Sequence, residues 1–341
     1  MPAIRPRDAA RGCPRGPAGA DWSRPPRAKE HRVTWDDGIP YVDRLADGIY
    51  AYVQPDGGWM VNNCGVVVDG AGAAVLVDTT STQRRNEAVL AEVARVSTGA
   101  PKAVVNTHHH PDHTYGNGFL PASTVVIGHE RCRDEVLLAG LEATRVITTP
   151  DYGDLTLRPP ELTFSDRMTL HLEGFPVELQ HVGRAHTSND VLVWLPEQRV
   201  LFTGDLAFAG GQPFVLEGSV SGFRTAVAHM RALAPEVLAP GHGPVCRGDE
   251  VGALLDRLDA YLAYVTEVAQ AALAEGLTPL EAATKHRDNP FSGWAETERF
   301  VGNLHRACSE LSGNPLDTRI TVPSVWPDMV AFHGGPIACH A

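Results

Sequence analysis

Imidazole and carboxylate side chains are concentrated in one short segment of the sequence, HHHPDH, which begins at His108. The preceding residues 103–107 form an apolar, β-branched run and predict a buried strand that leads into this loop. We expect His108 and His110 to face one position, and Asp112 and His113 to face a second position nearby. That arrangement suits two divalent ions about 3.5–4 Å apart. Imidazole and carboxylate ligands suit zinc, iron or manganese, whereas an iron–sulfur cluster or a structural zinc site would call for thiolates.

A solvated histidine-rich loop is the alternative interpretation, and further ligands downstream would distinguish the two. Three candidates follow strand-like runs, namely His186, Asp205 and His242. Gly241 and Gly243 flank the last of these and allow the backbone to crowd against an ion. Because catalytic groups in an α/β scaffold lie at the C-terminal edges of strands, these placements favour a metal centre.

With these residues in this order, the chain resembles the metallo-β-lactamase superfamily over residues 45–250. The resemblance implies an α/β fold, a four-layered αββα sandwich with a C-terminal helical extension. It also implies a ligand set: His108, His110 and His186 for one ion, Asp112, His113 and His242 for the other, and Asp205 as the bridge between them. Asp78 matches the aspartate that supports the metal loop in that family.

Asp205 distinguishes subfamilies, because the commonest subclass of true lactamases has cysteine at that position. An aspartate there is the pattern of glyoxalase II, lactonases and general hydrolases, although a further lactamase subclass also lacks the cysteine. The flavodiiron redox relatives have glutamate at the position of His110. The resemblance therefore favours hydrolysis over electron transfer, with two Zn²⁺ ions as cofactors and iron or manganese as the alternatives.

The expected chemistry follows from this ligand set. Two bridged cations lower the pKa of a bound water to about 7, which provides a hydroxide nucleophile at neutral pH, and they stabilise the oxyanion that forms. Asp205 and Asp112 are the expected catalytic carboxylates, with Asp112 able to protonate a poor leaving group. A thiolate departs without that help, so an acyl thioester or activated ester is the expected substrate.

A narrower resemblance concerns the phrases around these motifs, such as residues 106–117, 185–190 and 240–246. They look like the metallo-β-lactamase-fold cyclase/thioesterases of aromatic polyketide pathways. That branch implies antibiotic biosynthesis and an acyl carrier protein as partner. The alternatives are a generalist lactonase, a glyoxalase II-like hydrolase or a β-lactamase. A different class, an iron-dependent redox enzyme such as a persulfide dioxygenase, and a non-catalytic metal-binding fold also remain open.

Substrate contacts are expected on the segment between two predicted strands, 49–53 and 65–68, which leans over the metals in the related family. The candidates are Trp59, Met60, Asn62 and, beyond the metal loop, Tyr115. His109 points opposite its neighbours and is interpreted as structural. The proline-containing segment 141–164 is expected to border the active site as an insertion.

Composition sets the remaining limits. A chain of 341 residues that is 43% hydrophobic can hold one large α/β domain with appendages. We expect a disordered Arg/Pro-rich tail over residues 1–30, a catalytic domain over 31–248, and C-terminal helices and a tail over 249–341 packing on the core. The stretch 320–341 is expected to be non-helical.

A net charge of −12 argues against nucleic acid and anionic membranes as partners. The six scattered cysteines suggest free thiols and a cytoplasmic location. The C-terminal helices could also pack against a second copy of the chain in a homo-oligomer.

Overall fold

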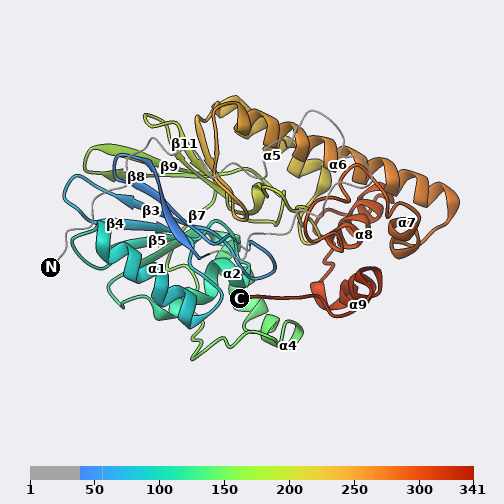
Figure 1. Cartoon of the computed structure of the whole chain (residues 1–341), viewed down its shortest axis with the longest axis horizontal. Coiled ribbons are helices and arrows are strands. Elements are labelled where there is room, and N and C mark those ends of the chain that lie inside the picture. The colour runs from blue at the N-terminus through green and yellow to red at the C-terminus, as the bar shows by residue number, and fades with distance from the viewer. Residues whose placement is uncertain (1–38, 56) are drawn as a thin grey trace.

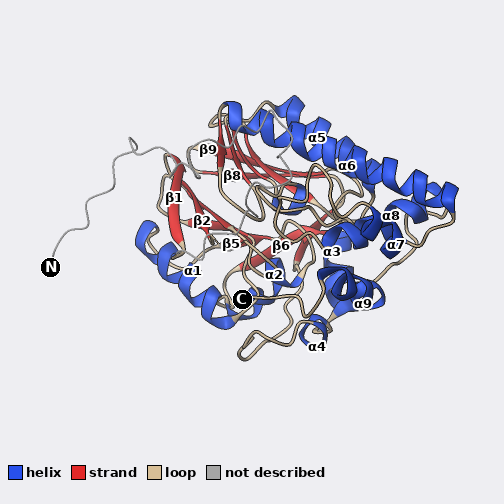
Figure 2. Ribbon diagram, turned by 45° about the vertical axis from the view of Figure 1, so that its right-hand side comes forward, coloured by secondary structure: helices blue, strands red, loops and turns tan. Residues whose placement is uncertain are grey.

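The structure, a computed structural model, describes residues 39–55 and 57–341. The predicted tail over residues 1–30 lies outside the described residues. Two β-sheets are stacked in the middle of the molecule, with helices on both outer sides (Figures 1 and 2). This arrangement confirms the predicted αββα sandwich.

The first sheet has seven strands in chain order. They are β1 (Tyr41–Ala46), β2 (Ile49–Val53), β3 (Cys64–Val68), β4 (Ala74–Val77), β5 (Ala103–Val105), β6 (Val125–His129) and β7 (Leu162–Phe164). Strands β1 to β4 pair antiparallel, and β4 to β7 pair parallel. The parallel strands bring the end of β5, and with it the HHHPDH loop, to one edge of the sheet.

The second sheet has six strands in the order β13-β12-β11-β10-β9-β8. They are β8 (Arg167–Leu172), β9 (Phe175–His181), β10 (Val191–Leu195), β11 (Val200–Phe202), β12 (Val237–Ala239) and β13 (Cys246–Arg247). All neighbours pair antiparallel except β11 and β12, which pair parallel. The residues after β11 and β12 therefore leave the sheet side by side.

The helices complete the layers. They are α1 (Gln83–Val96), α2 (Pro111–Thr114), η1 (Tyr115–Phe119), α3 (Glu130–Ala139), α4 (Ala143–Val146), η2 (Gly204–Leu206), α5 (Val220–Leu233), α6 (Asp249–Glu275), α7 (Pro279–Lys285), α8 (Arg299–Leu311) and α9 (Val322–His333). One apolar cluster fills the space between the sheets, with Ile127 of the first facing residues such as Leu179 of the second. A second cluster joins the first sheet to α1, and a third joins the second sheet to α5, α6, α8 and α9. The C-terminal helices thus share a continuous core with the second sheet.

The expectation that residues 320–341 are non-helical is wrong, because Val322–His333 forms α9. Pro323 lies in the first turn, where a missing N–H costs little. Val325, Met329 and Phe332 recur at helical spacing and are buried against the C-terminal core. Their burial offsets the hydrogen bond that Pro327 removes further along the helix.

Two further observations concern composition. The five described cysteines, Cys64, Cys132, Cys246, Cys308 and Cys339, are free thiols. Among residues 39–55 and 57–341, every helix is too short or too polar to span a bilayer.

Candidate metal centre and adjoining cleft

The backbone after β5 explains how the HHHPDH loop presents its side chains. His110 is extended, and Pro111, with its fixed φ, begins the short helix α2. His108 and His110 alternate along the extended part and face the same side, while Asp112 and His113 project from the first turn of α2. The segment therefore supplies two groups of side chains at two neighbouring positions.

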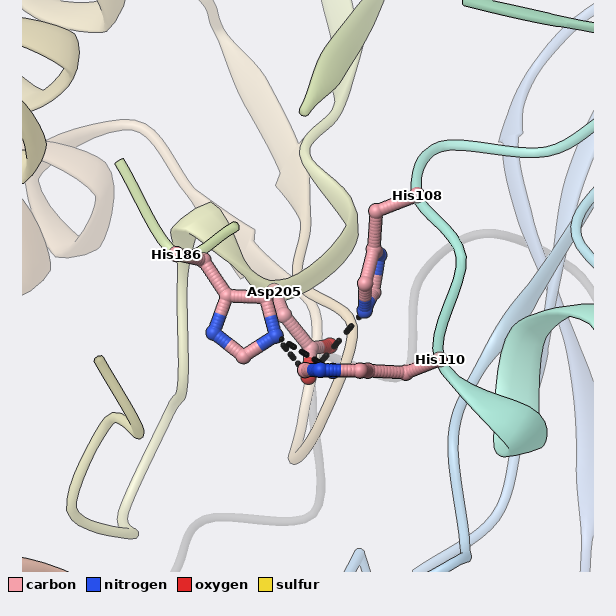
Figure 3. Close-up of side chains that lie close together, drawn as sticks. All are labelled: His108, His110, His186 and Asp205. Atoms are coloured by element: carbon pink, nitrogen blue, oxygen red, sulfur yellow. Dashed lines mark hydrogen bonds and ion pairs between the residues drawn. The ribbon is translucent and has the colours of Figure 1, made fainter. Parts of the chain in front are cut away.

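The first group gathers His108, His110, His186 and Asp205 (Figure 3). His186 Nε2 lies 2.9 Å from His110 Nδ1 and 3.4 Å from Asp205 Oδ2. His108 Nε2 lies 3.9 Å from the same carboxylate oxygen. Figure 3 shows two histidines reaching in from the HHHPDH loop and His186 from the opposite side, with Asp205 between them.

The second group gathers Asp112, His113 and His242 beside the same aspartate. His242 Nε2 lies 3.3 Å from Asp112 Oδ2 and 3.3 Å from Asp205 Oδ1. His113 Nε2 lies 3.1 Å from Asp205 Oδ1. The two oxygens of Asp205 thus face different groups, which is the position of a bridging carboxylate. All seven residues expected as ligands meet at one place.

The orientation of each histidine is fixed by a hydrogen bond on its outer nitrogen. His113 Nδ1 faces Asp78 Oδ2 at 2.8 Å, and His242 Nδ1 donates to the carbonyl oxygen of Gly57 at 2.9 Å. His186 Nδ1 donates to the carbonyl oxygen of Phe214. An oxygen partner holds the ring N–H on one nitrogen, so the opposite nitrogen is the one that gives up its proton to bind a metal. In every case that opposite nitrogen faces the centre of the site.

Asp78 supports the metal loop as the resemblance implies. Its Oδ1 accepts from the Thr107 backbone N–H at 2.7 Å, and its Oδ2 accepts from the Thr107 hydroxyl at 2.8 Å. That hydroxyl in turn lies 3.1 Å from His108 Nδ1. Asp78 has φ 63°, a strained value for a residue with a side chain. One buried carboxylate thereby orients a histidine from each group.

The electrostatics of the site keep Asp112 and Asp205 ionised. Burial would raise the pKa of Asp112, but the charge of His113 and a hydrogen bond to His242 bring it to about 2. Burial lowers the pKa of His186 to about 3, although Asp205 opposes the shift. Burial would also lower the pKa of His242, but the Asp205 charge and the hydrogen bond to Asp112 raise it to about 9. Protons on part of the histidine set thus occupy positions that a metal ion would take.

Three features show that these residues fit metal ions. His108 Nε2, His113 Nε2 and Asp205 Oδ1 are buried and make no regular hydrogen bond, which is costly unless a ligand compensates. Ligand atoms about 2.0–2.2 Å from a tetrahedral zinc are themselves about 3.4 Å apart, close to the separations observed. A Cβ on Gly241 would lie 2.1 Å from Asp205 Oδ1, so only glycine permits this approach.

Glu217 is a carboxylate at the site that the sequence analysis missed. Its Oε2 lies 3.1 Å from His110 Nε2 and 3.2 Å from His109 Nε2. The expectation that His109 points opposite its neighbours is wrong, because it shares this oxygen with His110 and lines the adjoining cleft; its other nitrogen contacts Asn189 at 3.1 Å. Glu217 therefore holds the outer nitrogen of a candidate ligand, as Asp78 does for His113. The one signal for Glu217 in the sequence was the general expectation that each ligand histidine has a hydrogen-bond partner on its outer nitrogen.

An apolar cleft opens onto both groups of ligands. Its empty volume, counted to the open mouth, is about 1080 Å³. Trp59, Met60 and Tyr115, the candidate substrate contacts, line it, and so do Val146 and Ile147 from the segment 141–164. Its remaining apolar lining comes from Pro111, Val136, Ala139, Ala143, Phe208, Phe214, Val322 and Pro323.

Asn62 is placed elsewhere. It is fully buried outside the cleft lining, and its amide group donates to the Thr79 carbonyl oxygen at 2.8 Å. The structure thus gives Asn62 a contact with the backbone next to Asp78, not one with the cleft. Its substrate role in the sequence analysis depended on its place in the segment over the metals, and the direction of one side chain could not be read from that.

Known proteins that are similar to this chain identify its family. The family model for the Metallo-beta-lactamase superfamily matches residues 57–242, more than half of the chain. The chain therefore belongs to this superfamily. The match identifies the superfamily and not a branch within it.

Three relatives of this chain have names that describe different activities. A linear primary-alkylsulfatase of Pseudomonas sp. is 25% identical over 300 residues, 74% of this chain and 57% of that protein. A metallo-beta-lactamase type 2 of Bacteroides fragilis is 24% identical and covers 59% of this chain and 78% of that one. A hydroxyacylglutathione hydrolase of Erythrobacter litoralis is 28% identical and covers 54% and 67%, respectively. The chain spans little more than half the length of the alkylsulfatase.

Among solved structures, the DIM-1 metallo-beta-lactamase superposes with a TM-score of 0.52 at 21% identity, covering 67% of this chain and 98% of that one. The likeness shows the shared fold.

Proposed function

We propose that this protein is a dinuclear metal-dependent hydrolase that cleaves an acyl thioester or ester with an apolar acyl group. The observation that carries the proposal is the apolar cleft that opens directly onto two adjoining groups of metal-ligating side chains. Relatives named as a hydroxyacylglutathione hydrolase, a lactamase and an alkylsulfatase support a hydrolytic reaction. Zn²⁺ is the proposed metal because the ligands are imidazoles and carboxylates in two compact groups.

When bound, two divalent ions would supply Lewis acidity and activate water at neutral pH. The chain's own part begins with Asp205, whose two oxygens keep the two groups of ligands at a fixed separation. Asp112 lines the cleft and is ionised, so it can accept a proton at the cleft floor and pass it to a leaving group. The aromatic and aliphatic walls hold the acyl chain and exclude bulk water.

Thioesters match this arrangement best, because a thiolate leaves without a proton whereas an amine requires one. An acyl carrier protein as donor and ring closure coupled to cleavage, as in polyketide cyclase/thioesterases, are the more specific form of the proposal. Pairing with a second copy of the chain also remains a proposal.

A substrate panel tests the proposal. Purified protein loaded with Zn²⁺ is given N-acetylcysteamine thioesters, a hydroxyacylglutathione, a lactone and nitrocefin, and kcat/KM is compared. We expect the thioesters with apolar acyl groups to be the best substrates. A preference for nitrocefin over every thioester would contradict the thioesterase proposal. Iron in the purified protein together with oxygen consumption would instead favour the redox alternative.

Alkyl sulfate cleavage is the second candidate, because the alkylsulfatase alignment covers 74% of this chain and thus extends beyond the family match. Adding an alkyl sulfate to the same panel decides between them.

A further inference from the structure

We propose that Arg299, the first residue of α8, binds an anionic group of the substrate, a carboxylate or a sulfate, next to the metal centre. The inference names the class of substrate for the proposed function and rests on that function for the reaction, but not for binding. A buried cation lies in the wall of the cleft.

Arg299 is buried, with 2% of its surface exposed, and it lines the cleft. Within the described residues, no carboxylate forms an ion pair with it. Its one hydrogen bond there runs from Nη1 to the Gln212 carbonyl oxygen at 3.1 Å, and Nε is buried without a partner. A buried guanidinium normally finds a carboxylate, because an uncompensated buried charge is costly. The cation is therefore short of an anion in the protein alone.

The guanidinium is held in place by aromatic rings of the cleft. Its carbon lies 4.6 Å from the ring centroid of Trp59 and 5.1 Å from that of Phe208. Trp59 is fixed by a 2.6 Å hydrogen bond from its Nε1 to Glu298. Stacked contacts of this kind stabilise a cation but leave the edge of its planar group free for an oxyanion.

The position relative to the metal centre follows from Phe208. The Phe208 ring stacks on the His242 ring at a centroid distance of 5.0 Å. The centroid of the Phe208 ring also lies 5.1 Å from the Arg299 guanidinium carbon. The cation and this candidate ligand are thus separated by no more than the sum of these two distances. An anion bound by Arg299 would lie a short spacer away from the group that reacts.

The distribution of charge in the cleft also favours an anionic ligand. Four carboxylates, Asp112, Glu142, Asp205 and Glu217, line it, and the formal charge of two divalent ions would balance theirs. Arg299 adds positive charge on one side, and Arg319 at the rim is already paired with Glu135 at 2.9 Å. A cleft with apolar walls and a cation beside the metals fits an amphiphilic anion better than a neutral acyl chain.

The kinetic test compares Arg299→Gln with the native chain on matched substrates. These are the mono-N-acetylcysteamine thioesters of succinate, adipate and suberate, each with its free carboxylate or as its methyl ester. We expect Arg299→Gln to raise KM for the best free acid by about 10- to 100-fold, the loss typical of a hydrogen-bonded charge, with little effect on the methyl ester. An equal loss on both members of each pair would overturn the proposal and leave Arg299 a structural part of the wall.

A binding test keeps the inference independent of catalysis. Calorimetry measures adipate, hexyl sulfate and the neutral hexanamide against metal-loaded and metal-free protein. We expect Arg299→Gln to weaken the anions selectively in both forms, and the anion that loses more identifies the carboxylate or the sulfate as its ligand. Unchanged anion affinity would refute the inference. If the native chain cleaves no thioester, the proposed function fails and this measurement alone decides the role of Arg299.

Two further variants test whether the effect is specific to Arg299 and to its charge. Arg257→Gln is the matched control, because its guanidinium also lies 5.3 Å from two aromatic rings and its Nε is also unpartnered, but it lies outside the cleft. It should leave the preference for anions unchanged. Arg299→Lys keeps the charge and should retain part of the preference, even where Arg299→Gln is poorly folded by circular dichroism. Loss of the preference in Arg257→Gln as well, or its complete loss in a folded Arg299→Lys, would contradict a specific contact.

Discussion

Replacing Glu217 by glutamine should weaken the binding of one metal ion and leave the binding of the other unchanged. The Glu217 carboxylate faces His110 Nε2 at 3.1 Å and His109 Nε2 at 3.2 Å, and its side chain is 20% exposed. Both imidazoles contact the same oxygen, Oε2, so the carbonyl oxygen of glutamine can take its place, but the negative charge is lost. His110 then loses the negative partner that orients its ring and raises the basicity of the nitrogen facing the metal centre.

The expected size comes from the general effect of such outer partners. Removing one typically costs about 10- to 100-fold in metal affinity, or about 1.4–2.7 kcal/mol. The loss should fall on the ion held by His108, His110 and His186, because the outer nitrogens of His113 and His242 bond to Asp78 and Gly57.

Competition with a chromophoric chelator measures this directly, since the two ions should be withdrawn in separable steps. Glu135→Gln is the control, as Glu135 pairs with Arg319 at the rim and contacts no candidate ligand. We expect Glu217→Gln, and not the control, to shift the step in which the ion held by His108, His110 and His186 is withdrawn. Equal weakening of both ions, or affinities that match those of the control, would refute the role assigned to Glu217.

Four other predictions follow from the site. Elemental analysis should find two metal ions per chain, and Asp205→Ala should lose the most metal, because two adjacent cations would lack their shared anionic ligand; a single ion in the native chain would contradict the dinuclear site. Trp59→Ala should raise KM more than it lowers kcat, measured by steady-state kinetics on an apolar thioester, and an effect confined to kcat would contradict a binding role. Metal binding at pH 7 should release protons, because His242, with a pKa of about 9, is protonated before the metal enters; affinity should therefore rise with pH until about 9, and calorimetry in buffers of different ionisation enthalpy would show no release if this is wrong. Chelation should lower the melting temperature, since metal binds the folded chain preferentially, and an unchanged transition would show that the site is not loaded.

The sequence by itself determined the centre of the site and the layers that carry it. The HHHPDH segment keeps its ligands within six residues, so local backbone geometry, with Pro111 starting a helix, decides where they face. Strand-like runs before His186, Asp205 and His242 placed these residues at strand ends, because hydrophobic patterning is local. The long helix α6 likewise lies within residues 249–341, where the sequence predicted C-terminal helices.

Only the tertiary structure decided the partners of that centre. Glu217 meets His110 across 107 residues of chain, and Arg299 meets Trp59 from the far end of the sequence. Glutamate and arginine are common surface residues, and nothing in their neighbours' identity reveals that they are buried beside an imidazole or an indole. Asn62 turned out to contact the backbone because side-chain direction depends on the packed loop around it. Pairings over such distances follow from how the two sheets and the C-terminal helices pack, and packing is a property of the whole chain.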